Sequence, residues 1–120
     1  MSSMITDADC LFCKMAKGTF PVDMLHEDGL VFAIRDIAPR APTHLIVIPK
    51  QHIPTAHHLT GAESPLLGHM FSVAAKLMDD LELSERGYRL TINVGAEGGQ
   101  SVYHLHMHVL AGRQLGTEAG

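Results

Sequence analysis

The chain has 120 residues, of which 46% are hydrophobic and 18% charged, so it can form one domain with a buried core and is not disordered as a whole. Nine basic and thirteen acidic residues give a formal net charge of −4, which argues against nucleic acid as the main partner. With two Tyr, four Phe and no Trp, the chain also lacks the aromatic side chains of a platform for single-stranded bases.

The sequence carries no signal for a membrane or for export. No apolar run approaches the roughly 18–20 residues that a membrane helix needs, and the polar N-terminus lacks the pattern of a signal peptide. We therefore expect a soluble, cytoplasmic protein with no membrane partner. A single domain is expected over residues 1–120, with residues 1–8 and 115–120 as flexible tails.

Four short elements are predicted in the first half of the chain. Residues 10–17 form a helix that ends at Gly18. Residues 22–26 and 30–35 form the strands of a hairpin, because a Glu-Asp-Gly turn signal separates them. Residues 44–49 form a strongly apolar strand that is bounded by prolines.

One long helix is predicted over residues 60–81, because apolar side chains recur there at helical spacing. Two signals mark different starts for this helix. Thr60 and Glu63 resemble a capping box, whereas Ser64 and Pro65 fit equally well as the cap and the first helical residue. The expected apolar stripe consists of Leu67, Met70, Phe71, Ala74, Leu77, Met78 and Leu81.

The last third of the chain returns to extended structure. Strands are predicted over residues 88–94 and 102–110, with a glycine-rich loop over residues 95–100 between them. The order helix, hairpin, strand, helix, strand, strand favours an α+β domain with a mostly antiparallel sheet.

Nine histidines are present, and three of them alternate with apolar residues near the end of the chain. His104, His106 and His108 share one face of a strand, because the side-chain period of a strand is two. A plain solvent-exposed face normally carries mixed polar residues rather than three of one scarce type. A zinc site is a rival interpretation, since His is the commonest metal ligand, but three ligands at this spacing fit one ion poorly.

A polar, glycine-rich segment lies directly before these histidines and consists of Gly98, Gly99, Gln100 and Ser101. Glycines let the backbone approach a ligand closely, and the Gln and Ser side chains add hydrogen-bond donors. Alone, this segment would be an ordinary turn. Beside three histidines it favours a phosphate pocket.

The segment 99–110, with the sequence GQSVYHLHMHVL, resembles the signature of the histidine triad (HIT) family, in which three histidines alternate with apolar residues. The resemblance extends over about residues 9–114 and takes in residues 11–12, 36–37, 41–50 and 88–93. It implies an HIT-like fold with a five-stranded, mostly antiparallel sheet, one long helix and one short helix. It also implies a homodimer in which two sheets become continuous, which covers an exposed edge strand.

Within this family the chain resembles the histidine triad nucleotide-binding proteins, which are purine nucleoside phosphoramidases. The resemblance implies a hydrolase that cleaves the P–N bond of amines linked to AMP or GMP. His106 would attack the α-phosphorus and form a nucleotidyl-histidine intermediate that water then hydrolyses, a role that suits an imidazole near pH 7. This chemistry requires no cofactor.

The resemblance assigns the other catalytic roles residue by residue. His44 and His108 orient the site and hold phosphate charge, and His104 is the remaining member of the triad. Ser101 donates a hydrogen bond to a phosphate or leaving-group atom.

The resemblance also assigns the nucleotide contacts. Gly99 and Gln100 add donors beside Ser101, and Asn93 contacts the phosphate and ribose. Asp36 accepts hydrogen bonds from the two ribose hydroxyls. An apolar slot for a purine base is formed by Leu11, Phe12, Met15, Phe20, Ile34 and Ile37.

Cys10 and Cys13 form a C-x-x-C pair, which in a reducing compartment suggests metal or redox chemistry more than a disulfide. Some relatives hold a structural zinc ion with such a pair and two histidines, and the matching residues here are Cys10, Cys13, His52 and His104. The alternative is a pair of reduced, partly buried thiols. The remaining histidines are interpreted as solvated surface residues: His26, His57, His58 and His69.

Three alternatives to a phosphoramidase remain open. A dinucleoside polyphosphate hydrolase of the same superfamily is disfavoured, because the fragile-histidine-triad type carries Gln where His108 stands here. A scaffold dimer would bind AMP or GMP, and any hydrolysis of a nucleotide by it would be incidental to its role. A zinc hydrolase with histidine ligands would lose its activity to a chelator.

Overall fold

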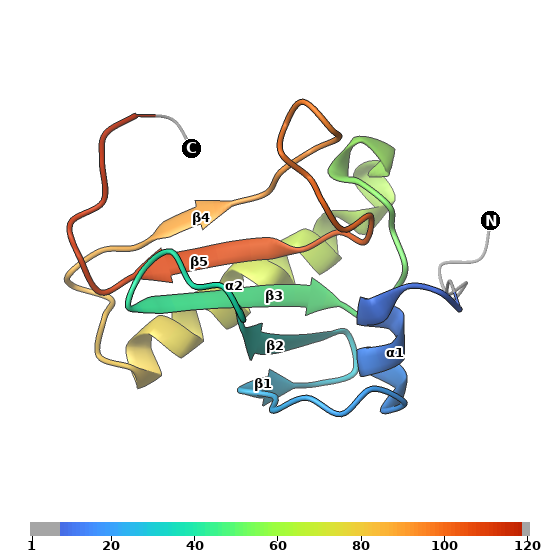
Figure 1. Ribbon diagram of the computed structural model, residues 1–120, viewed down its shortest axis with the longest axis horizontal. Helices are drawn as coiled ribbons and strands as arrows, with labels where there is room; N and C mark the ends of the chain where they lie inside the picture. The colour runs from blue at the N-terminus through green and yellow to red at the C-terminus, as the bar shows by residue number, and fades with distance from the viewer. Residues whose placement is uncertain (1–7, 119–120) are drawn as a thin grey trace.

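Five strands form one sheet in the computed structural model, which describes residues 8–118 of the chain (Figure 1). In this part of the chain the strand order is β1-β2-β3-β5-β4, and every neighbouring pair is antiparallel. The elements are α1 (Leu11–Lys17), β1 (His26–Glu27), β2 (Val31–Arg35), β3 (Thr43–Pro49), α2 (Ser64–Asp80), β4 (Arg89–Thr91) and β5 (Met107–Ala111). The expected α+β fold with an antiparallel sheet, a short helix and a long helix is confirmed.

The sheet separates two apolar clusters, one on each of its faces. On one face α2 packs on alternate residues of the central strands, among them Leu45, Met107 and Val109. On the other face Phe12 and Met15 of α1 pack on the alternate strand residues that point away from α2: Phe32, Ile34, Ile46 and Ile48. Since side chains alternate across a strand, the odd-numbered apolar residues of segment 104–109 turn toward α2, and the histidines turn toward α1.

The register of β3 and β5 brings together histidines that are 64 residues apart in the chain. Ile46 lies opposite His108, and His44 lies opposite Leu110. His44 and His108 are therefore diagonal neighbours on one face of the sheet, within reach of each other's side chains.

Both predicted starts of the long helix are used. The Thr60 hydroxyl and the Glu63 carboxylate form a capping box that opens a 3₁₀ turn over Gly61–Glu63. The α-helix then begins at Ser64, with Pro65 in its first turn, where a missing N–H costs no helical hydrogen bond. The prediction of residues 60–81 therefore covers a 3₁₀ turn followed by α2.

The predicted stripe of this helix is wrong at two positions. Phe71 and Leu81 are 48% and 38% exposed, whereas Leu66 and Val73 are buried against the sheet. The buried face is therefore rotated slightly from the predicted one, and Phe71 lies at the surface.

The predicted strand over residues 102–110 begins only at Met107. Before that point the backbone bonds to a loop instead of a strand, since Leu105 N–H donates to the Ile53 carbonyl at 2.7 Å. The two edge strands also differ from the prediction. β1 spans His26–Glu27 and so shares only His26 with the predicted strand over residues 22–26, and β4 spans only Arg89–Thr91 of the predicted 88–94.

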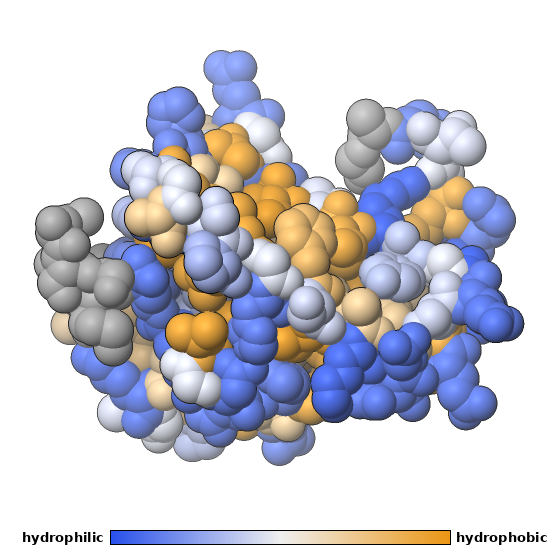
Figure 2. Space-filling view, turned by 180° about the vertical axis from the view of Figure 1, so that it is seen from behind, coloured by the Kyte–Doolittle hydropathy of each residue, from blue (hydrophilic) through white to orange (hydrophobic). Residues whose placement is uncertain are grey.

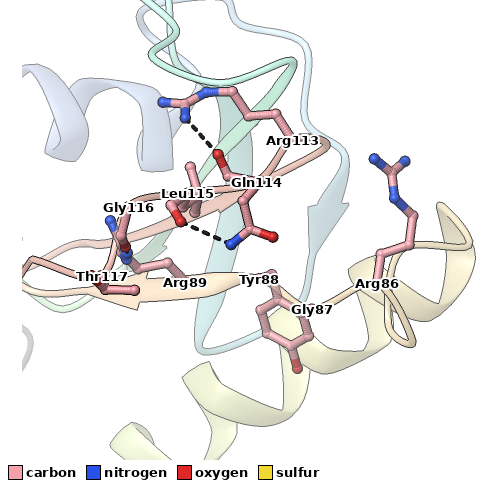
Figure 3. A pocket seen from close by; sticks show the side chains of 9 residues that line it. All are labelled: Arg86, Gly87, Tyr88, Arg89, Arg113, Gln114, Leu115, Gly116 and Thr117. Atoms are coloured by element: carbon pink, nitrogen blue, oxygen red, sulfur yellow. Dashed lines mark hydrogen bonds between the residues drawn. The ribbon is translucent and has the colours of Figure 1, made fainter.

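After β5 the chain runs back beside β4. Arg89 donates a hydrogen bond to the carbonyl of Gly116, and Arg113 donates to the Gln114 carbonyl at 3.1 Å (Figure 3). Of the predicted tails, residues 1–7 and 119–120 lie outside the described residues, whereas residues 8 and 115–118 are described, and the flexibility of both tails stays a prediction. Every helix within residues 8–118 falls short of the length and apolarity that a membrane crossing needs.

Candidate active site

The ring of His106 is held by one hydrogen bond to the backbone. Its Nδ1 lies 2.7 Å from the carbonyl oxygen of His104. A carbonyl can only accept, so Nδ1 carries the hydrogen, and Nε2 of the neutral ring holds an unshared electron pair. The residue is 8% exposed and lines a cavity, so this free nitrogen belongs to a sheltered site rather than to the open surface.

A chain of hydrogen bonds fixes the proton positions of His44 and His108. The backbone N–H of Arg40 donates to Nδ1 of His44 at 3.1 Å, which leaves the ring hydrogen of His44 on Nε2. This Nε2 lies 2.8 Å from Nδ1 of His108, so His108 accepts there and carries its own hydrogen on Nε2. The site therefore offers an imidazole acceptor, His106, next to an imidazole donor, His108.

Burial keeps these two histidines neutral. Desolvation lowers the pKa of His108 to about 4, helped by the neighbouring His106 and His44 and opposed by the Asp36 carboxylate. Burial also lowers the pKa of His44, again against the effect of Asp36, whose Oδ2 lies 3.4 Å from its Nε2. Near neutral pH the pair therefore acts through hydrogen bonds rather than through positive charge.

The cavity beside these histidines has a volume of about 310 Å³, which is at the lower end of the range for small-molecule sites. Most of the predicted site residues line it, namely Leu11, Phe12, Met15, Ile34, Asp36, Ile37, Asn93, Gly99, Ser101, His106 and His108. Apolar side chains of α1 and β2 form one part of the wall, and the polar loop after β4 forms another. The cavity thus joins an apolar slot to a polar corner that contains the histidines.

Four of the residues predicted for catalysis or nucleotide binding do not line this cavity. Phe20 is 45% exposed, and His44 lies behind His108. His104 is fully buried and reaches the site through its carbonyl. Gln100 is the fourth. A second hollow of about 270 Å³, between residues 86–89 and 113–117, contains none of the predicted site residues (Figure 3).

Gln100 does not face the cavity, because its side chain is hydrogen-bonded within the glycine-rich loop and to the Pro54 carbonyl. Its side-chain Nε2 donates to the carbonyls of Pro54 and Val102 at 2.8 and 3.0 Å. Its Oε1 accepts from the N–H of Gly95 at 2.9 Å. With its amide used in this way, Gln100 holds the loop closed, and Gly99, at φ +86°, supplies a backbone conformation that side chains rarely adopt.

Sequence reasoning missed some residues of the wall. Ile46, Val102 and Arg35 also line the cavity. Ile46 lies two residues after His44 on β3, so both side chains are on the same face of the strand, and strand periodicity could have predicted Ile46 as part of the wall. The Arg40 amide left no signal in the sequence, because a backbone group acts the same way whatever the side chain.

Cys10, Cys13, His52 and His104 converge at the N-terminus of α1. Nδ1 of His104 lies 3.3 Å from Cys10 Sγ, 3.5 Å from Cys13 Sγ and 3.0 Å from Nδ1 of His52. All four ligand atoms lie within 4.8 Å of one another. A tetrahedral zinc ion with bonds of ~2.0–2.3 Å holds its ligands roughly 3.3–3.8 Å apart, so this donor set has nearly the right size.

The proton position of His104 also suits a metal. Its Nε2 lies 2.7 Å from the Pro49 carbonyl and must donate there, which leaves Nδ1 bare and directed at the thiols. A backbone carbonyl on the far ring nitrogen is the usual support of a metal-bound histidine. The residues present therefore fit a Cys₂His₂ zinc site.

Asp36, His44 and His108 form another group of possible metal ligands. Here the proton positions oppose a metal. The Arg40 N–H occupies Nδ1 of His44, so the Nε2 that faces Asp36 and His108 is protonated and has no electron pair for an ion. This geometry disfavours a metal ion at Asp36, His44 and His108.

An unprotonated imidazole nitrogen, a neighbouring imidazole donor and a half-apolar cavity define the site of an enzyme that works by histidine chemistry. The chain belongs to the HIT family, since the HIT domain model matches residues 17–115. It is 44% identical to the purine nucleoside phosphoramidase of Escherichia coli K12 over 108 residues, which cover 90% of this chain and 91% of that protein.

Solved structures agree with this assignment. A HIT family hydrolase from Legionella pneumophila superposes with a TM-score of 0.91 at 48% identity, over 93% of this chain and 100% of that one. A histidine triad protein from Clostridium difficile gives a TM-score of 0.92 at 36% identity, over 96% and 100% of the two chains. The chain is therefore a hydrolase of the HIT family.

The low pKa of His108 predicts a pH-dependent stability. The unfolded chain takes up a proton at this residue below about pH 6.5, while the folded chain resists until about pH 4, so acid favours unfolding in this window. In His108→Gln the slope of unfolding free energy against pH should fall by up to about 1.4 kcal/mol per pH unit. Urea unfolding at several pH values between 4.5 and 6.5 measures it, and an unchanged slope would contradict a neutral, buried His108.

Proposed function

We propose that this chain hydrolyses purine nucleoside 5′-phosphoramidates, in which an amine is bound to the α-phosphorus of AMP or GMP. The observation that carries the proposal is the single hydrogen bond from His106 Nδ1 to the His104 carbonyl, which leaves Nε2 free to attack. The name of the Escherichia coli relative, a purine nucleoside phosphoramidase at 44% identity, supports the substrate class.

In the first step His106 Nε2 attacks the α-phosphorus, and the P–N bond breaks as the N–P bond to histidine forms. The His108 N–H donates to a phosphoryl oxygen and stabilises its charge. Ser101, in the wall of the same cavity, donates a proton toward the leaving amine. The His104 carbonyl keeps Nδ1–H bonded while the ring gains positive charge.

In the second step water attacks the phosphorus of the nucleotidyl-histidine, the N–P bond breaks, and AMP or GMP is released. The water supplies one proton to restore Ser101 and places its oxygen on the phosphate. The sum is one phosphoramidate and one water converted to one amine and one nucleoside monophosphate, with no change of oxidation state.

The rest of the nucleotide would occupy the slot beside these histidines. Asp36 Oδ1 already accepts from the Ala38 N–H at 2.8 Å, which holds the carboxylate in the cavity wall, where it can accept from ribose hydroxyls. Phe12, Ile34 and Ile37 offer apolar area to the base. Area and stacking accept adenine and guanine alike, so we propose that both AMP and GMP derivatives are used.

The proposal is tested by hydrolysis of AMP coupled through its phosphorus to a fluorescent amine, such as tryptamine. Wild type should release the amine, and His106→Ala should lose at least about a thousandfold in kcat, because the nucleophile itself is removed. His57→Ala is the control and should keep the wild-type rate, since His57 is exposed and lies outside the cavity.

A chelator separates the remaining alternatives. The wild-type rate should survive chelation at a temperature where circular dichroism shows an intact fold. Loss of the rate under those conditions would favour a metal hydrolase. If wild type binds AMP yet turns over neither the phosphoramidate nor a dinucleoside polyphosphate, the chain is a nucleotide-binding scaffold instead.

We also propose that Cys10, Cys13, His52 and His104 hold a structural zinc ion. Bound there, the ion would cross-link α1 to the segment after β3 and to the segment before β5. It would take no part in the chemistry of the cavity. Two thiolate ligands require a reducing environment, which agrees with the expected cytoplasmic location.

Removal of this ion should lower stability rather than chemistry. His52→Gln should lose the tightly held Zn²⁺ and melt on the order of 10 °C lower, equivalent to about 3 kcal/mol. His57→Gln makes the same change at an exposed histidine and should match wild type. Metal content by mass spectrometry and thermal unfolding measure both, and full metal content in His52→Gln would refute the site.

Finally, we propose that the chain forms a homodimer through the face that carries α2 and through the open edge of β4. β4 has a strand neighbour only on its β5 side among the described strands. Apolar side chains gather on the α2 face (Figure 2), where Phe71 is 48% exposed. Pairing two such faces would cover both the apolar surface and the sheet edge.

Phe71→Glu tests this assembly by placing a charge in the proposed interface. Light scattering should give twice the 13.0 kDa chain mass for wild type and a shift toward 13.0 kDa for the variant. Lys14→Glu introduces the same side chain on α1, away from this face, and should remain dimeric. A wild-type mass of one chain at micromolar concentration would overturn the proposal.

A further inference from the structure

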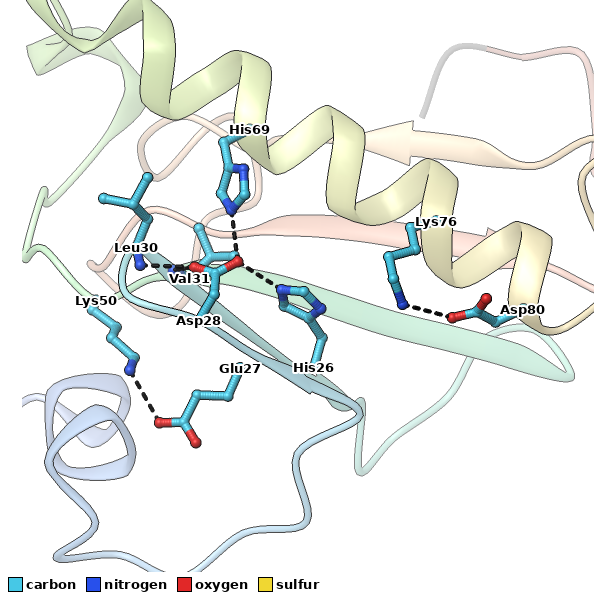
Figure 4. Close-up of polar contacts among 9 residues, drawn as sticks. All are labelled: His26, Glu27, Asp28, Leu30, Val31, Lys50, His69, Lys76 and Asp80. Carbon is cyan, nitrogen blue, oxygen red and sulfur yellow. Dashed lines mark hydrogen bonds and ion pairs between the residues drawn. The ribbon is translucent and has the colours of Figure 1, made fainter.

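Two histidines that the sequence placed among the solvated surface residues belong to a cluster with Asp28. His26 lies on β1, Asp28 in the turn after it, and His69 on α2 (Figure 4). Nε2 of His26 and Nε2 of His69 lie 2.7 and 2.6 Å from the same carboxylate oxygen, Asp28 Oδ2. The side chains are 17%, 35% and 29% exposed for His26, His69 and Asp28, so the surface interpretation of both histidines is wrong.

The carboxylate of Asp28 is fixed before either histidine contacts it. Its other oxygen, Oδ1, accepts from the backbone N–H of Leu30 at 2.7 Å and of Val31 at 2.9 Å. These two bonds orient Oδ2 toward the gap between β1 and α2. Glu27, the next acidic side chain, turns away from this gap and pairs with Lys50 at 3.0 Å (Figure 4). One oriented carboxylate oxygen thus faces two imidazoles.

We propose that His26, Asp28 and His69 form a second zinc site, separate from the cysteine site and from the cavity. Two imidazole nitrogens and one carboxylate oxygen are a donor set that Zn²⁺ takes, with water in the fourth position. The three ligand atoms lie within 4.8 Å of one another. Two neutral imidazoles and one carboxylate carry a single negative charge, which a divalent cation offsets.

The cluster needs only a small movement to hold the ion. Ligands of a tetrahedral zinc ion lie roughly 3.3–3.5 Å apart, so the two contacts of 2.6 and 2.7 Å must open by under an ångström. Among the contacts of the described residues, both rings are held through Nε2 to Asp28 alone. Each ring hydrogen can therefore move to Nδ1 and free Nε2 for the metal, and the partial exposure leaves room for water.

A metal here would link β1 to α2. β1 is an edge strand of only two residues, joined to the sheet through β2. His69 is 41 residues from Asp28 in the chain, so an ion at this point connects the outer hairpin to the long helix. The site would make the stability of this edge depend on zinc concentration.

Zinc titration of metal-free protein tests the proposal, with calorimetry as the readout. Wild type should bind two equivalents of Zn²⁺, one tight and one weaker, and His69→Gln should lose only the weaker one. His57→Gln, the same change at an exposed histidine, should keep both. With Co²⁺ as the probe, the first equivalent should give a thiolate charge-transfer band and the second should add none, because its ligands include no sulfur.

Each contrary outcome overturns the site. Equal Zn²⁺ binding by wild type and His69→Gln, or equal losses in His69→Gln and His57→Gln, would show that the cluster binds no zinc. If wild type takes one equivalent while His69→Gln merely melts at a lower temperature, the three side chains form a hydrogen-bonded link and the metal proposal fails. Circular dichroism of the metal-free variants separates a lost site from a lost fold.

Discussion

The hydrogen bond from His106 Nδ1 to the His104 carbonyl is the contact on which the chemistry of this structure depends. It makes one ring nitrogen a donor and thereby leaves the other with an unshared electron pair, as the proposed attack on phosphorus requires, with no charged partner needed. His104 is fixed in turn by its own bond to the Pro49 carbonyl. The Phe12 ring packs edge-on against both imidazoles, with centroids 5.7 and 5.2 Å away. The fold therefore fixes the orientation of the His106 ring through the backbone carbonyl of His104.

The same sheet that carries these contacts also keeps the site neutral. Burial opposes protonation of His108 and His44, and the Asp36 carboxylate only partly reverses this effect. A neutral donor beside a neutral acceptor can stabilise a phosphoryl group without holding the product by strong ion pairing. Because the pair is set by the β3–β5 register, a slip of β5 by one residue would turn His108 to the α2 face, away from His44.

Much of this arrangement was readable from the sequence, because period and spacing report on which face a side chain lies. The alternation of residues 104–109 was enough to place the histidines together, even though β5 begins only at Met107. The role of the glycine-rich loop was harder to predict. The Gln100 side chain could donate to a ligand, but its amide is hydrogen-bonded to backbone groups instead. Contacts between distant segments, such as His69 with Asp28, have no local signal at all, which is why His26 and His69 passed for ordinary surface residues.

Histidine count alone says little about metals in this chain, whereas the position of each ring hydrogen says more. A carbonyl on Nε2 of His104 frees Nδ1 toward two thiols, so that cluster is prepared for an ion. An amide on Nδ1 of His44 does the reverse and commits Nε2 to a hydrogen bond. At His26 and His69 neither ring is bound to a described backbone group, so the choice between a shared proton and a shared metal is left to zinc concentration. The backbone group that each imidazole meets therefore fixes which of its nitrogens carries the hydrogen and which keeps an electron pair.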